Sequence, residues 1–183
     1  MGKDLDRTIW RGQRPWVEIW FAVILDEHRR RGLWIRQSLF VPKTGAARAT
    51  IWGAWFDADA TPPSRAAKRY LPLDMSMIGK DSALIRIDDS QISHQGASGA
   101  VEGLAWDVQW SGVREGHGEG PAWLPAPTHA RSIASDADAT GRVTLGNDTV
   151  DLRGRAVAMH LWGKRRVPTL HWVYAPWLGD GSL

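Results

Sequence analysis

The chain has 183 residues, a formal net charge of +3 and 43% hydrophobic residues, which is typical of a soluble globular protein with a single core. It contains no cysteine, which excludes disulfides, cysteine-ligated zinc and cysteine nucleophiles. No apolar run approaches the ~18 residues of a membrane span, and no apolar signal segment opens the chain. We therefore expect a cytoplasmic protein without a membrane span.

Tryptophan dominates the aromatic composition, with twelve Trp against three Phe and two Tyr. A buried indole needs an acceptor for its N–H group. So many indoles predict large interior surfaces that are partly polar.

The first third of the chain predicts an antiparallel meander of three strands. Val17–Leu25, Leu33–Val41 and Arg48–Asp57 alternate with a period of two, and a highly charged turn separates the first two. Both faces of Val17–Leu25 are mostly apolar, as expected of a barrel or sandwich wall. Gly53, inside the third strand, predicts a bulge or a close backbone approach.

The middle of the chain is less regular and then returns to strands. A single helical turn is predicted over Arg65–Tyr70, and Pro72 stops it. Strands are predicted at Leu84–Asp88, at Gln91–Gln95 and, with clean alternation, at Leu104–Ser111.

The last third predicts two further hairpins. Arg142–Leu145 and Thr149–Leu152 flank a Gly-Asn-Asp turn. Ala156–Trp162 and Thr169–Trp177 form the second hairpin, across a basic turn at Lys164–Arg166. Nearly all regular structure is thus strand, which predicts an all-β antiparallel barrel or strongly bent sandwich with few short helices.

Common catalytic and metal motifs are absent. The pentapeptide DADAT occurs at 57–61 and 136–140 without the Gly and distal Glu of a calcium loop, so both copies are predicted as turns. Gly96–Ala100 misses the fifth position of a hydrolase nucleophile elbow. The histidines lack metal-ligand spacing. We expect neither a metal nor a cofactor.

Glu18 and Arg36 lie on neighbouring predicted strands in apolar surroundings. Burial of either charge alone costs several kcal/mol, so each needs a partner. Two interpretations remain open: an ion pair that fixes strand register, or a cavity wall that orients a polar group of an apolar ligand.

Basic runs beside aromatic residues also suggest single-stranded nucleic acid. Arg29–Arg31 and Lys164–Arg166 fit this pattern, but both are short and lie in predicted turns, and the net charge is modest. Nucleic acid is the least favoured partner.

Three segments resemble the lipocalin-like family of carotenoid 1,2-hydratase (hydroxyneurosporene synthase) and AttH-type proteins. WVEIWFAVILDEHRRRGLWIRQSLFVPKTGAARATIWGAWFD resembles the opening meander of that family. GLAWDVQW is similar to its Gly-x-x-Trp-Asp strand. VTLGNDTVDLRGRAVAMHLWGKRRVPTLHWVYA resembles a hairpin that leads into a His-x-Trp-Gly motif.

This resemblance implies a calycin-type barrel that binds or transforms a large apolar molecule, such as an isoprenoid or polyketide, by hydration or cyclisation. If the domain is catalytic, Glu18 or Asp107 is the candidate proton donor or acceptor. The resemblance places Trp20, Arg36, Trp106, His160, Trp162 and Trp172 at the ligand.

Family members carry two barrel-like domains. Residues 1–183 resemble the first, as a single domain, so a second domain or a second copy of this chain is a further expected partner.

Two functional hypotheses follow from the sequence. The first is a Trp-lined barrel that binds an apolar small molecule, with or without catalysis. The alternative is a non-enzymatic structural or dimerising domain whose tryptophans form a closed core. A cavity of roughly 300 Å³ or more between the Trp side chains would favour the first.

Overall fold

The computed structural model of the protein describes residues 7–60, 64–73, 83–112, 126 and 128–164. These residues form ten β-strands and no helix. The strands are β1 (Trp16–Asp26), β2 (Arg31–Val41), β3 (Arg48–Asp57), β4 (Ser64–Pro72), β5 (Ala83–Ile87), β6 (Ser90–Ser93), β7 (Gly96–Val101), β8 (Leu104–Ser111), β9 (Thr128–Leu145) and β10 (Asp148–Gly163).

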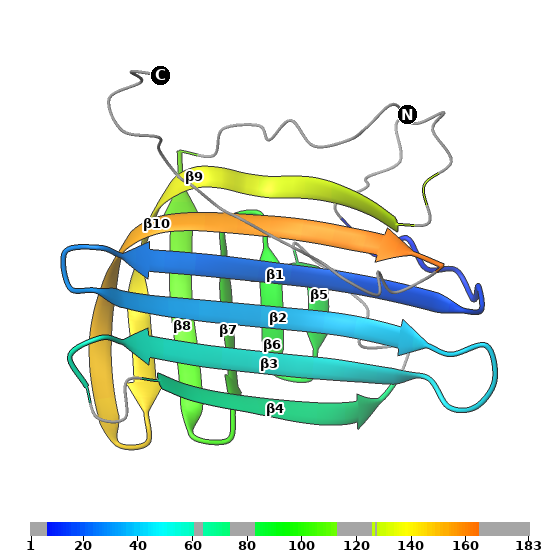
Figure 1. Cartoon of the computed structure of the whole chain (residues 1–183), viewed down its shortest axis with the longest axis horizontal. Coiled ribbons are helices and arrows are strands. Elements are labelled where there is room, and N and C mark those ends of the chain that lie inside the picture. Colours follow the sequence, from blue (N-terminus) through cyan, green and yellow to red (C-terminus); the bar gives the residue numbers. More distant parts are fainter. Residues whose placement is uncertain (1–6, 61–63, 74–82, 113–125, 127, 165–183) are drawn as a thin grey trace.

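All ten strands belong to one antiparallel sheet, in the order β4-β3-β2-β1-β10-β9-β8-β7-β6-β5. Strands that follow each other in sequence are neighbours, except for β4 and β5, which lie at the two edges of the sheet. In addition, β10 returns to pair with β1. The sheet curls so that β1–β4 face β5–β8 across the interior (Figure 1). This is the lipocalin-like barrel expected from the sequence.

The long strands β9 and β10 join the two walls of the barrel. The second half of β10 pairs with β1, from Arg155 to Gly163, whereas the β9 segment Asp138–Leu145 pairs with β8. Both strands bend between these regions (Figure 1). The pairing of β9 with β10 shifts register at this corner, as a β-bulge does.

Arg155 bridges β10 and β9 at the bend of these two strands. Its guanidinium donates to the carboxylates of Asp136 and Asp138, and Asp136 has a positive φ of 52°. The hydrogen bond that Arg155 donates to Asp136 is the main cause that raises the pKa of Arg155 above its ordinary value, and the charge of Asp138 adds to it. The second DADAT copy is therefore a bulged strand and not the predicted turn.

Alternation fixes which side chains form the core. On β1, the face with Trp16, Trp20 and Ile24 is buried, and the face with Val17 and Leu25 is only half-buried. The buried series on β1 to β3 meets Leu104, Trp106 and Val108 of β8 in one core cluster. Gly53 confirms the predicted close approach: an added Cβ would lie 2.9 Å from Trp106 Cζ3.

Two predictions about local structure are wrong. Residues 65–70 form no helical turn but belong to β4, because backbone pairing with β3 outweighs the weak helical pattern of an exposed edge segment. The predicted partner of Ala156–Trp162 was Thr169–Trp177, which lies outside the described residues. Both edges of β10 are already hydrogen bonded, one to β1 and the other to β9. The segment Ala156–Trp162 therefore pairs with these two strands and not within the predicted hairpin.

Candidate functional site

Glu18 is a fully buried carboxylate that four hydrogen-bond donors surround. Its Oε1 accepts from the backbone N–H of Ile9 at 2.6 Å and faces His160 Nε2 at 3.0 Å. Its Oε2 accepts from the backbone N–H of Trp10 at 3.0 Å and from Trp16 Nε1 at 2.9 Å. A carboxylate has about four lone-pair sites, so all of them are occupied.

His160 lies in the register of β10 that faces Trp20 of β1, and it is also fully buried. Its ring stacks on Trp20, with centroids 4.3 Å apart and an interplanar angle of 9°. The Trp162 ring lies 4.7 Å from the His160 ring, in a tilted arrangement, and is itself stacked on His129 at 5.6 Å. Because an ionised carboxylate only accepts, Glu18 places a proton on His160 Nε2.

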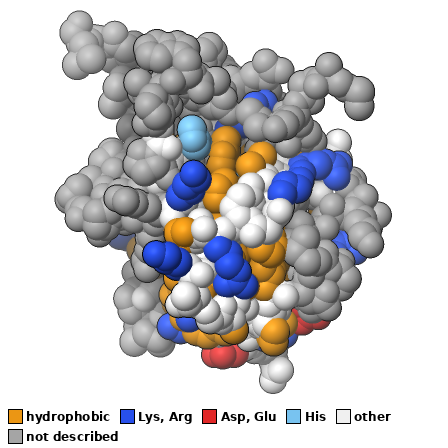
Figure 2. Space-filling model, turned by 90° about the vertical axis from the view of Figure 1, so that its right-hand side faces the viewer, with side chains coloured by type: hydrophobic (Ala, Val, Ile, Leu, Met, Phe, Trp, Pro, Cys, Tyr) orange, Lys and Arg blue, Asp and Glu red, His pale blue; other side chains and the backbone are white. Residues whose placement is uncertain are grey.

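A small second core closes this end of the barrel. Trp10, Trp16, Val41 and Trp162 pack together, and the carboxylate of Glu18 ties the segment around Ile9 and Trp10 across them. Figure 2 shows this end, with Lys and Arg side chains around hydrophobic ones. Its exposed cations include Arg11, Arg14, Lys43 and Arg48.

The ion pair between Glu18 and Arg36, one of the two interpretations that the sequence leaves open, does not form. In the register of β1 and β2, Glu18 lies opposite Leu39 and Arg36 lies opposite Phe21, so the two charges are on opposite faces of the sheet. Arg36 is half-buried on the outer face, where its guanidinium lies 5.9 Å from the centre of the Trp52 ring. Arg36 therefore does not line the interior of the barrel.

The other predicted site residues are likewise divided between the interior and the outer face of the sheet. Trp106 is buried and reaches across the interior, whereas Asp107 is exposed on the outer face of β8. Trp20, His160 and Trp162 lie together in the aromatic stack. Trp172 lies outside the described residues.

Sequence reasoning missed Gln37. It is fully buried on the interior face of β2, between Ile35 and Leu39, and pairs in register with Trp20 on β1 and Ile51 on β3. Neither polar atom of its amide has a hydrogen-bond partner in the described part of the chain. An amide within an otherwise apolar alternating series was the signal that could have identified it.

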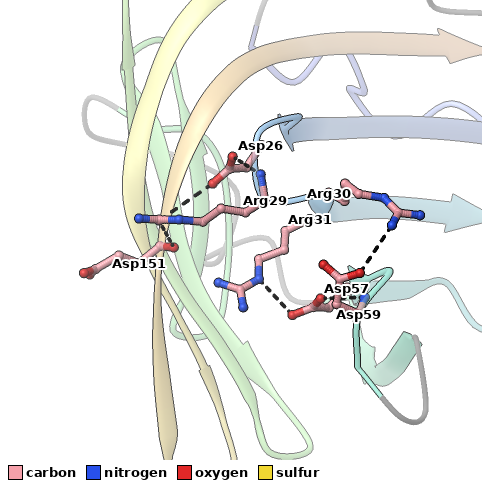
Figure 3. Close-up of polar contacts among 7 residues, drawn as sticks. All are labelled: Asp26, Arg29, Arg30, Arg31, Asp57, Asp59 and Asp151. Carbon is pink, nitrogen blue, oxygen red and sulfur yellow. Dashed lines mark hydrogen bonds and ion pairs between the residues drawn. The ribbon is translucent and has the colours of Figure 1, made fainter.

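The basic run Arg29–Arg31 is neutralised by carboxylates (Figure 3). Arg31 pairs with Asp57 at 2.8 Å, Arg30 with Asp59 at 3.3 Å, and Arg29 with Asp26 at 3.9 Å. These ion pairs leave the run little net positive charge with which to bind a phosphate backbone. The two aspartates of the first DADAT copy, Asp57 and Asp59, are thus the partners of Arg31 and Arg30. In the described ranges, no group of three or more His, Asp or Glu side chains could hold a metal.

Two surface hollows lie away from the aromatic stack. One, of about 640 Å³, is formed by polar side chains of β6–β9, including Asp107. The other, of about 700 Å³, lies beside the turn after β1 and near Arg155. Neither is lined by Trp20, Trp106 or Trp162.

The sequence matches no family model. It is 28% identical over 185 residues to an uncharacterized protein from two strains of Mycobacterium tuberculosis. The match covers 95% of this chain and 53% of that relative, so the chain spans about half the length of the curated relatives it matches.

The fold is shared with a crystal structure of an AttH-type protein from Nitrosomonas europaea, at a TM-score of 0.62 and 12% identity over 83% of this chain and 52% of that one. Kievitone hydratase from Nectria haematococca follows at a TM-score of 0.48 and 8% identity, with 79% of this chain and 46% of that chain covered. The first likeness supports the lipocalin-like fold. Within the described residues, no helix has the length and apolarity to cross a bilayer.

Proposed function

We propose that this domain binds an apolar small molecule, isoprenoid- or polyketide-like, against the aromatic wall that Trp20, His160 and Trp162 form inside the barrel. The observation that carries the proposal is the buried polar pair within that wall. A closed core has no need of a carboxylate and an imidazole at zero exposure, since apolar side chains of similar volume would avoid the cost of desolvating both groups, even though the hydrogen bonds of Glu18 are made.

The finer proposal is hydratase- or cyclase-type chemistry on that ligand. The π faces of Trp20 and Trp162 would stabilise a developing carbocation, as aromatic faces stabilise cations. Glu18 acts as a positioning residue, because four donors already occupy its oxygens, and His160 is the group left to exchange a proton.

Titration with retinol, an apolar isoprenoid alcohol, tests binding through energy transfer from tryptophan. Trp20→Phe on the inner face should weaken retinol about tenfold, which corresponds to about 1.4 kcal/mol and to the upper range for an aromatic stack. The matched control is Trp52→Phe, because Trp52 lies on the outer face of β3, and it should change the affinity by less than about twofold. Absence of saturable transfer in the wild type overturns the proposal.

A dimerising structural domain is the second candidate, favoured by the outer surface. Phe56 and Tyr70 are 49% and 53% exposed, and β4 and β5 are the two edges of the sheet in the described strands. Unpaired edges are templates for pairing with another chain. Sedimentation over a range of concentrations would show reversible dimers and no retinol binding if this candidate is right.

A further inference from the structure

Two buried polar groups inside the barrel have no hydrogen-bond partner in the described residues. One is the amide of Gln37, whose Oε1 and Nε2 are both unpaired, and the other is the indole Nε1 of Trp106. The two side chains are 0% and 3% exposed. Most buried polar atoms in native proteins are paired, so two such groups in one interior need an explanation.

The two groups project from opposite walls of the barrel toward the same interior. Gln37 pairs in register with Ile51 on β3. Trp106 comes from β8 and reaches β3 at Gly53, two residues along from Ile51. The strands β2 and β8 lie on facing walls (Figure 1).

The unpaired donors and acceptor indicate which kind of ligand group could pair with them. The Gln37 amide offers two N–H donors and one carbonyl acceptor, and Trp106 offers one further N–H donor. A hydroxyl group complements this set, because its oxygen accepts from N–H donors while its O–H donates to the Gln37 carbonyl. A charged group is disfavoured, since the neighbours of Gln37 include Trp20, Ile35, Leu39 and Ile51.

We propose that Gln37, with Trp106, is the specificity-determining polar site of the barrel and that it selects a neutral hydroxyl on an otherwise apolar ligand. This inference rests on the proposed function, because it names the ligand class at the same interior. It adds a residue on β2 that the aromatic stack does not include.

Retinol and retinyl methyl ether test it, since the pair differs by one hydroxyl hydrogen and one methyl group. The wild type should bind retinol about 10- to 100-fold more tightly, because the ether leaves the Gln37 carbonyl unpaired. Gln37→Met keeps the volume and removes the polar atoms, so the preference should fall to less than about twofold. In the same variant, the Tm of the free protein should rise by about 2–10 °C, because an unpaired buried amide is removed.

Leu39→Met is the matched control, an interior substitution one alternation further along β2 that removes no polar atom. It should retain the preference for retinol. An equal preference in Gln37→Met and wild type overturns this inference alone, and so does a lower Tm in Gln37→Met, which would show that the amide is paired in the free protein. If the wild type binds neither probe, the proposed function falls together with the inference.

Discussion

Substitution of Glu18 by Gln should remove much of the stability of the domain. The amide keeps one oxygen with two acceptor sites and replaces the other with an NH2 group that only donates. Two of the four hydrogen bonds at this position are then lost. Each hydrogen bond to a charged group contributes about 1.5–3 kcal/mol, so the expected loss is about 3–6 kcal/mol.

That loss is large against the total stability of about 5–15 kcal/mol for a typical domain. At about 2–4 °C per kcal/mol for a chain of this length, Tm should fall by about 6–24 °C. Urea unfolding followed by tryptophan fluorescence measures the free energy of unfolding directly. Asp107→Asn is the control, because this carboxylate is exposed, and it should change stability by less than about 0.5 kcal/mol.

Local unfolding should begin in the segment around Ile9 and Trp10, whose backbone N–H groups donate to Glu18. Either Ile9 or Trp10 loses its acceptor in the variant, depending on which oxygen the NH2 group replaces, so trypsin should cut after the exposed Arg11 faster than in the wild type. The reasoning is refuted if Glu18→Gln costs less than about 1 kcal/mol, or if the rate of cleavage at Arg11 is unchanged.

Three further predictions concern other positions. His160→Phe keeps the aromatic stack but removes the donor to Glu18, so urea unfolding should show a loss of about 1.5–3 kcal/mol; a gain would mean that the pair is not hydrogen bonded. Gly154→Ala should cost more than about 3 kcal/mol, because its Cβ would lie 1.8 Å from the carbonyl oxygen of Leu25, whereas Gly146→Asn, in open space at a φ of 67° that Asn tolerates, should cost less than about 1 kcal/mol by the same measurement. Arg155→Met should cost about 1 kcal/mol at low salt and less at 1 M salt, and an equal loss at both salt concentrations would argue against an ionic contribution at the corner.

The sequence predicted the class of fold because alternation is a local property. Leu104–Ser111 was predicted with the bounds that β8 has, and Arg48–Asp57 with those of β3. The bend of β9 and β10 was not predictable in this way, because a bulge and an arginine bridge between distant residues determine it. The predicted strand at 142–145 is therefore only the end of a strand that begins at Thr128.

The site shows the limit of period-two reasoning. Arg36 and Gln37 are adjacent, and a shift of one residue exchanges the two faces of a strand. On one face of β2, Arg36 lies between Trp34 and Phe40; on the other, Gln37 lies between Ile35 and Leu39. The two faces are therefore equally apolar in the sequence. Only the pairing of β2 within the curled sheet decides that Gln37 faces the interior and Arg36 the outside, so the sequence alone did not tell which of the two lies inside.

The return of β10 to the side of β1 has a consequence for folding. One edge of β1 pairs with β2, which lies within about 25 residues of it in the sequence. The other edge pairs with Arg155–Gly163, about 140 residues further along the chain. Pairing between such distant segments is slow, because loop closure precedes the contacts that reward it. During synthesis, β1 therefore remains an open, strongly apolar edge until the end of β10 has left the ribosome, and it is the segment at which premature association between nascent chains is expected to start.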